Sequence, residues 1–207
     1  MPNQHYSPSR FQRALAVVAL LLAVAIAGTT WFIVNQPRNG TGTGIALVGG
    51  PFSLSDHNGQ RVTDKTFLGK NLLVVFGFTY CPDVCPTELQ VVTAALESLG
   101  SRADDIQPLF ITIDPGRDTP EIMKQYVANF HPRFVGLTGN PEEIAAVAKA
   151  YRVYYAKVDS KSGPNDYLMD HSSIMYLMDK QGKFLKHFSY TTDAAALADG
   201  IAGALAP

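Results

Sequence analysis

The sequence predicts one α/β domain, a sandwich of helices around a mixed central sheet. Two short apolar runs, at residues 72–78 and 108–113, have the length and continuity of strands buried on both faces. A helical pattern follows each run, and a hairpin pattern with a closing helix ends the chain. With 207 residues and 46% hydrophobic content, the chain suffices for one well-packed domain plus additional segments.

The domain is expected to begin with a small β-hairpin. Residues 52–54 alternate in polarity, Asn58-Gly59 is a strong two-residue turn signal, and residues 61–63 resume the alternation. The buried strand over residues 72–78 comes next. The helix after it carries Leu89, Val92, Leu96 and Leu99 on one face and ends at Gly100.

The second half repeats the alternation of strand and helix. After the strand at 108–113, Thr119-Pro120-Glu121 opens a helix by an N-cap threonine and a proline in the first turn. The inner stripe of that helix is predicted to be Ile122, Tyr126 and Phe130. Asn140 and Glu143 have capping-box spacing before a further helix, whose core-facing residues are predicted to be Ile144, Val147 and Tyr151.

The C-terminal part reads as a hairpin and a helix. Residues 174–178 and 183–190 flank the turn sequence at 179–182, which predicts antiparallel strands. Asp193 then caps a last helix that carries Leu197, Ile201 and Leu205.

The N-terminal region predicts a membrane anchor and a tether. Residues 14–34 carry no charged side chain and are long enough to cross a bilayer. Arg10 and Arg13 precede them, which places residues 1–13 in the cytoplasm and the bulk of a bacterial inner-membrane protein in the periplasm. The alternative is a signal peptide cleaved after Ala25-Ile26-Ala27. Glycine-rich residues 35–50 form the tether, and residues 51–207 form the domain.

Charge and cysteine content exclude two classes of protein. The formal net charge is −1 and there is no Lys/Arg run, so nucleic-acid binding is not expected. The two cysteines, Cys81 and Cys85, are too few and too close for a structural disulfide framework. Their proximity indicates redox or metal chemistry.

Cys81 and Cys85 lie between the buried strand at 72–78 and the helix that follows, where open α/β sheets place their ligands. A helix N-terminus favours thiolate, which is both the nucleophile and the metal ligand. On a helical turn the C-x-x-x-C spacing separates the Cβ atoms by about 5 to 6 Å, wider than a disulfide prefers, so a metal suits the gap better. Two unreactive buried cysteines are the plain alternative.

A third metal ligand has to come from elsewhere, and histidine is the natural source. His171 stands immediately before the strand at 174–178, at the strand mouth that faces the cysteine segment. The other histidines are more simply read as surface or partly buried residues: His5, His57, His131 and His187. Two thiolates and one imidazole suit copper as Cu(I) or Cu(II), whereas zinc would normally want a fourth ligand.

Three segments, in this order, closely resemble the Sco/SenC proteins. They are FGFTYCPDVCPTEL at 76–89, ITIDPGRDTPEIMKQY at 111–126 and YLMDHSSIMYLMDKQGKF at 167–184. The resemblance implies a thioredoxin-like fold and one copper ion bound by Cys81, Cys85 and His171. It also implies a chaperone that receives copper from a donor protein. The chaperone would deliver it to, or prepare the cysteines of, the binuclear copper centre on cytochrome c oxidase subunit II.

Several alternatives stay open at this point. Cys81 and Cys85 could instead be the redox pair of a periplasmic thiol-disulfide oxidoreductase, or the domain could be a redox sensor. By family analogy, Asp114, Arg117 and Asp118 form a polar loop near the site; a loop-internal ion pair explains them equally well. Asp170 either orients His171 or is a solvated loop residue.

Overall fold

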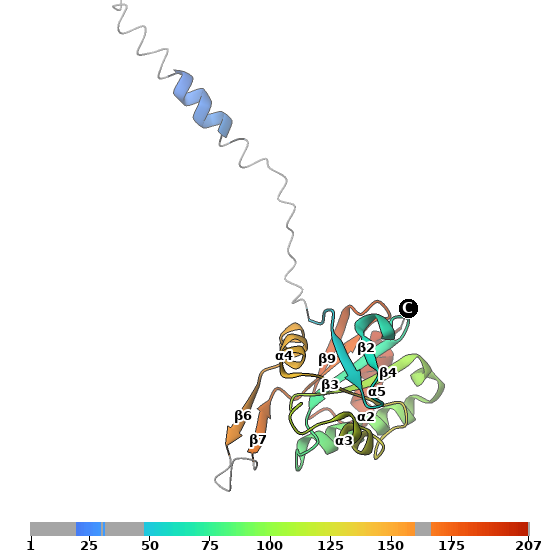
Figure 1. The fold of residues 1–207 in the computed structure, drawn as a ribbon. Helices are drawn as coiled ribbons and strands as arrows, with labels where there is room; N and C mark the ends of the chain where they lie inside the picture. The colour runs from blue at the N-terminus through green and yellow to red at the C-terminus, as the bar shows by residue number, and fades with distance from the viewer. Residues whose placement is uncertain (1–19, 30, 32–47, 160–166, 207) are drawn as a thin grey trace, which may run out of the picture. The chain divides into compact units, whose positions relative to one another are not determined.

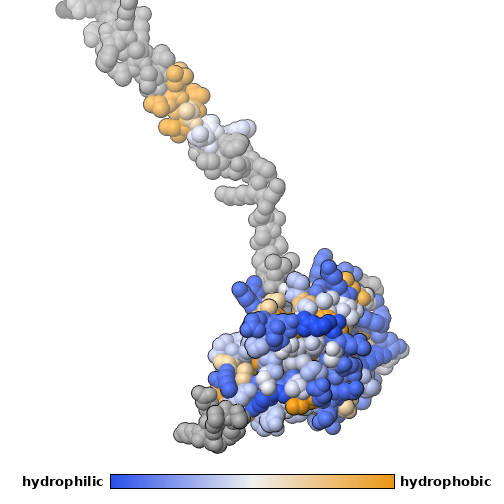
Figure 2. Space-filling view, in the orientation of Figure 1, coloured by the Kyte–Doolittle hydropathy of each residue, from blue (hydrophilic) through white to orange (hydrophobic). Residues whose placement is uncertain are grey.

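A computed structural model describes residues 20–29, 31, 48–159 and 167–206. The chain divides into two units, Met1–Ile45 and Ala46–Pro207. In the first unit, residues 20–29 are helical, and Figure 2 shows most of this helix as strongly apolar. No helix among the described residues has the length and apolarity needed to span a bilayer. The anchor expected at 14–34 lies partly outside the described residues. Residues 1–13 and most of the tether expected at 35–50 also lie outside the described residues.

The second unit is built on one seven-stranded sheet and one separate two-stranded sheet (Figure 1). The order in the main sheet is β2-β1-β5-β4-β3-β8-β9, and the small sheet is β6-β7. The strands are β1 (Ser53–Asp56), β2 (Arg61–Thr63), β3 (Asn71–Gly77), β4 (Ile106–Thr112), β5 (Val135–Thr138), β6 (Tyr155–Asp159), β7 (Tyr167–His171), β8 (Ile174–Met178) and β9 (Phe184–Ser189).

The main sheet is mixed, as predicted. Strands β3, β4 and β5 run parallel, whereas β8 is antiparallel to β3 and β9 to β8. The N-terminal hairpin β1–β2 joins this sheet, because Ser55 pairs with Thr138 of β5. All seven residues of β3 are buried, which explains its continuous apolar sequence.

Helices cover both faces of the main sheet. The helices are α2 (Val84–Leu99), α3 (Pro120–Val127), α4 (Pro141–Ala150) and α5 (Ala194–Ala204), with short 3-10 turns at Asp64–Phe67 and Gly100–Asp105. Leu89 of α2, Met123 of α3 and Leu197 of α5 belong to one core cluster. Ile144 and Val147 of α4 belong to the cluster on the other face. The result is the expected sandwich.

The predicted helix starts are confirmed, and of the stripe predicted for α3 Tyr126 and Phe130 pack against the core, whereas Ile122 does not belong to it. The Asn140 side chain accepts a hydrogen bond from the Glu143 backbone and Glu143 reciprocates, so the capping box is formed. In α3 the fully buried residues are Met123 and Val127, whereas Ile122 is only partly buried. Met123 takes the place predicted for Ile122, because it belongs to the same core cluster as Leu89.

Three strands were not anticipated. Strand β5 is four residues long and includes Gly136, so its pattern is too short to stand out. Strands β6 and β7 form an arm that is not hydrogen-bonded to the main sheet and that projects from the body (Figure 1). We call this pair, residues 155–159 and 167–171, the β6–β7 arm. His171 is its last residue, so the arm presents the predicted ligand.

Candidate metal centre

The cysteine segment connects the buried strand β3 to α2. The backbone N–H of Cys81 donates to the Phe78 carbonyl at 3.2 Å in the turn, and Cys85 lies in the first turn of the helix. The prediction that both cysteines share a helical turn is wrong, because α2 begins only at Val84. Cys85 is fully buried, whereas Cys81 is partly exposed at the surface.

The structure brings the three predicted ligands together. The Sγ atom of Cys85 lies 3.6 Å from Nε2 of His171, and the backbone N–H of Cys85 donates to Sγ of Cys81 at 3.4 Å. Nδ1 of His171 lies 3.2 Å from the Ser172 carbonyl, which can only accept a hydrogen bond. This contact puts the ring proton on Nδ1 and leaves the Nε2 lone pair facing the cysteines.

A glycine at the end of β3 makes this approach possible. A Cβ atom on Gly77 would lie 2.8 Å from Cys85 Sγ and 2.8 Å from the Phe110 ring. Neither neighbour has room to withdraw, because both side chains are fully buried. Gly77 is therefore required for the cysteine to sit against the sheet.

The pKa values of the two thiols are shifted in opposite directions. A hydrogen bond from the Cys85 side chain is the main cause that lowers the pKa of Cys81 to about 5, and the backbone N–H of Cys85 adds to it. The same hydrogen bond, followed by burial, raises the pKa of Cys85 above its ordinary value. Cys81 is thus the accessible thiolate near neutral pH, and Cys85 holds its proton.

Glu88 is a site residue that the sequence reasoning missed. It is 2% exposed, and within the described residues both of its carboxylate oxygens lack a hydrogen-bond partner. Burial, and next the charge of Cys81, raise the pKa of Glu88 to about 7. The signal was present in the sequence, because Glu88 and Leu89 are three and four positions after Cys85, on the inner face of α2.

The loop after β4 supports the cysteine segment. The fully buried Asp118 carboxylate accepts from Thr79 N at 3.1 Å, Thr79 Oγ1 at 2.6 Å and Thr112 Oγ1 at 2.5 Å. Burial raises the pKa of Asp118 despite these bonds. Asp114 and Arg117 form the expected loop-internal ion pair, with Nε to Oδ2 at 2.5 Å.

The structure also shows the surroundings of Asp170 and of three of the four other histidines. Asp170 is exposed and alternates to the opposite face of β7 from His171, so it is a solvated residue. His57 accepts from the Gly136 backbone at 3.0 Å, and His187 is exposed and stacked on Phe184. His131 is partly buried and accepts from the Arg133 backbone, whereas His5 lies outside the described residues.

The described side chains contain no group of three or more His, Cys, Asp or Glu residues that is already closed around a metal position. Cys81 and His171 each lie close to Cys85, and the β6–β7 arm carries His171. A metal would therefore draw together donors that are already neighbours.

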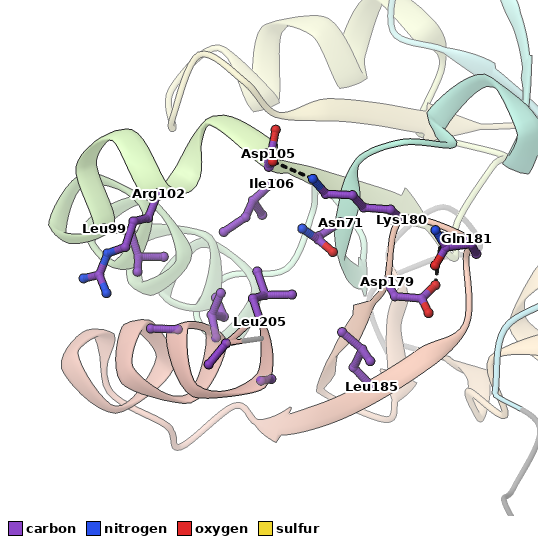
Figure 3. Close-up of a pocket in the computed structure, with 14 residues that line it drawn as sticks. Asn71, Leu99, Arg102, Asp105, Ile106, Asp179, Lys180, Gln181, Leu185 and Leu205 are labelled. Carbon is purple, nitrogen blue, oxygen red and sulfur yellow. Dashed lines mark hydrogen bonds and ion pairs between the residues drawn. The ribbon is translucent and has the colours of Figure 1, made fainter.

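A cavity of about 660 Å³ lies at the other end of the central strands (Figure 3). Asn71 and Ile106, the first residues of β3 and β4, line it, whereas the cysteines follow the last residue of β3. Its charged lining includes the ion pair of Lys180 with Asp105 at 2.6 Å, shown in Figure 3. None of the candidate ligands lines this cavity.

A family model and individual relatives of this chain point to the same protein family. The family model described as SCO1/SenC matches residues 41–206. The chain is 48% identical to the human protein SCO1 homolog, mitochondrial, over 79% of this chain and 55% of that protein. It is 46% identical to the Arabidopsis thaliana protein SCO1 homolog 1, mitochondrial, over 79% of this chain and 49% of that protein. The chain thus spans about half the length of these relatives.

A solved structure of a relative supports the same conclusion. The crystal structure of Arabidopsis thaliana ScoI with copper bound is 45% identical and superimposes with a TM-score of 0.73. The superposition covers 76% of this chain and 98% of the other. The mixed α/β fold of the domain therefore matches that of the thioredoxin-like Sco structures. From its sequence, its fold and the match over residues 41–206, this chain belongs to the SCO1/SenC family.

Proposed function

We propose that this protein is a copper metallochaperone that holds one copper ion with Cys81, Cys85 and His171. The observation that carries the proposal is that the imidazole nitrogen of His171, 86 positions along the chain from Cys85, lies beside the cysteine pair. A copper-bound structure of a relative with 45% identity supports the choice of metal. The donor set is soft and charge-reducing, which suits Cu(I), while the imidazole also accommodates Cu(II).

The spacing of one donor pair, Cys85 and His171, fits a shared metal. Bonds of about 2.3 Å to thiolate and about 2.0 Å to imidazole, at a trigonal angle, put the two donor atoms about 3.7 Å apart. The distance between Cys85 Sγ and His171 Nε2 is 3.6 Å. The Nε2 lone pair already faces the sulfur, so His171 needs no change of tautomer to bind.

Each residue contributes differently to loading. Cys81 is partly exposed and its thiol has a lowered pKa, so it is the sulfur that an incoming copper meets first as thiolate. Cys85 is buried and must release its proton when copper binds. His171 completes the set from the arm.

Copper stoichiometry tests the proposal. Reduced wild-type protein should bind one copper per chain, and Cys81→Ser and Cys85→Ser should each retain none after dialysis against a competing chelator. His57→Ala is the matched control, because its ring contacts the backbone of β5 rather than the site. Wild-type retention of copper by either serine variant would contradict the proposal.

A second candidate function has its own support. A low-pKa exposed thiol beside a buried thiol is the arrangement of a thiol-disulfide reductase. The Cys81 thiolate would attack one sulfur of a partner disulfide and release the partner's other thiolate. Cys85 would then attack the Cys81 sulfur, which frees the partner's second thiol and leaves a Cys81–Cys85 disulfide. The two partner sulfurs gain the two electrons that Cys81 and Cys85 lose.

The cellular setting is also a proposal. Family membership supports a role in assembly of cytochrome c oxidase, and we infer that subunit II, with its binuclear copper centre, receives the copper from this protein. We further infer an uncleaved anchor at residues 14–34 in a bacterial inner membrane, with the domain in the periplasm. A mature protein that starts at Gly28 in mass spectrometry would contradict the anchor.

A further inference from the structure

His171 can stay beside the cysteines only if contacts with the rest of the domain hold the β6–β7 arm in place. It forms no strand pairing with the main sheet, and two strands alone are marginally stable in water. Within the arm, Tyr155 pairs with His171. The position of the imidazole therefore depends on how the arm is attached to the body.

One face of β7 makes that attachment. Tyr167, Met169 and His171 alternate along the strand and are all partly buried, whereas Leu168 and Asp170 are exposed. Met169 packs against the same core cluster as Cys81. Tyr167 lies at the end of this face away from His171.

Arg117 and Asp114, in the loop after β4, make three contacts with Tyr167: two hydrogen bonds and one cation–π contact. Nη1 of Arg117 donates to the Tyr167 carbonyl at 2.9 Å, and the guanidinium carbon lies 3.6 Å from the centroid of its ring. The Tyr167 hydroxyl donates to Asp114 Oδ1 at 2.7 Å. Backbone, ring and hydroxyl are thus all held by one ion pair.

The same guanidinium also contacts the cysteine segment. Its central carbon lies 4.6 Å from the Tyr80 ring centroid and 6.0 Å from that of Phe78. Tyr80 is adjacent to Cys81, and the Phe78 ring meets the His171 ring edge-on at 6.1 Å. One side chain therefore touches both the arm and the segment that carries the first thiolate.

The Arg117–Asp114 ion pair is largely shielded from water. The Arg117 and Asp114 side chains are 16% and 6% exposed. Among the described residues, the Nη2 atom of Arg117 is buried with no hydrogen-bond partner, so aromatic faces surround that part of the guanidinium. The planar guanidinium of Arg117 stacks on aromatic rings and bonds both to the Asp114 carboxylate and to the Tyr167 carbonyl. A lysine ammonium cannot make this set of contacts.

We propose that Arg117, held by Asp114, is a positioning residue that fixes the β6–β7 arm so that His171 stays within reach of the cysteine pair. This inference deepens the proposed copper function and rests on it for the role of His171. The attachment itself is a property of the metal-free chain. It can therefore be measured without copper.

Hydrogen exchange on the reduced, copper-free protein tests the attachment. In Arg117→Met, amides of the β6–β7 arm should exchange at least tenfold faster than in wild type, while protection of the buried strand β3 stays unchanged. Lys157→Met is the matched control. Its Nζ lies 3.5 Å from the centroid of the same Tyr167 ring, but this contact lies within the arm itself.

A second measurement links the attachment to the ligand. Arg117→Met and Arg117→Lys should lower Cu(II) affinity at least tenfold, toward the value of His171→Ala, and Lys157→Met should not. Arm exchange within twofold of wild type in Arg117→Met would overturn the proposal. If β3 also loses protection, Arg117→Lys replaces Arg117→Met. Wild-type exchange of the arm amides in Arg117→Lys would then overturn the proposal equally.

The two proposals fail in different ways. If His171→Ala binds copper like wild type, the ligand assignment is wrong, whatever Arg117 does. The exchange rates of the metal-free arm still decide whether Arg117 holds it.

Discussion

Replacing Glu88 by glutamine should change how stability depends on pH. The carboxyl is 2% exposed, has no hydrogen-bond partner within the described residues, and its pKa is raised from 4.5 to about 7. A raised carboxyl pKa means that the folded state holds its proton more tightly than the unfolded state. The stability from this group is therefore complete below pH 4.5 and is lost as pH rises through about 7.

The size of the effect follows from the shift. Each pKa unit corresponds to about 1.4 kcal/mol, so the rise to about 7 costs the folded state about 3 kcal/mol at pH 8 relative to pH 4.5. Glutamine has the same shape and cannot ionise. The unfolding free energy of Glu88→Gln minus that of wild type should thus increase by about 3 kcal/mol between these pH values.

Urea denaturation of the reduced protein at several pH values measures this difference directly. Taking the difference between variant and wild type cancels the titrating groups that do not interact with Glu88. Comparing that difference at two pH values removes any constant effect of the amide. Glu97→Gln, at an exposed position of the same helix, is the matched control. A flat difference for Glu88→Gln would refute the reasoning, because the carboxyl would then be solvated.

Three further predictions concern the thiols and their support. The alkylation rate of Cys81 should be on its plateau at pH 7 and fall about tenfold per unit below about pH 5; a midpoint near pH 8 would show an ordinary thiol. Oxidation of Cys81 and Cys85 to a disulfide should abolish copper binding, since neither sulfur is then a thiolate. Equal copper retention by oxidised protein would contradict the ligand set. Asp118→Asn should cost about 1 to 3 kcal/mol in urea denaturation, because an amide cannot accept all three bonds; a cost under about 0.5 kcal/mol would show that Thr79 is held otherwise.

The strands with continuous apolar sequence were predictable because the structure buries both of their faces. Strand β3 has all seven residues buried, so no alternation blurs its pattern. Strands β6 and β7 alternate between partly buried and exposed residues and pair only with each other, so their signal resembles that of a loop. In α3, Ile122 and Met123 begin equally spaced stripes, and only packing against the sheet selects Met123.

The site divides in a similar way. The proximity of the cysteine pair to His171 was predictable, because the cysteines follow β3 and His171 precedes β8, which pairs with β3. Glu88 was readable from its position on the apolar face of α2. The contact of Arg117 with Tyr167 could not be predicted from the sequence. The two residues are fifty positions apart, and Tyr167 belongs to an arm whose strands the sequence did not reveal.

The copper affinity of His171→Ala tests the central claim most directly. Cu(II) favours imidazole more strongly than Cu(I) does, so the variant should bind Cu(II) well over tenfold more weakly than wild type. Thiol exchange with a small dithiol probe should stay within a few fold, because the cysteine pair is intact. His187→Ala, exposed on β9, is the control and should match wild type in both assays. Wild-type affinity for both copper ions in His171→Ala, together with lost thiol exchange, would contradict the copper site and favour the reductase.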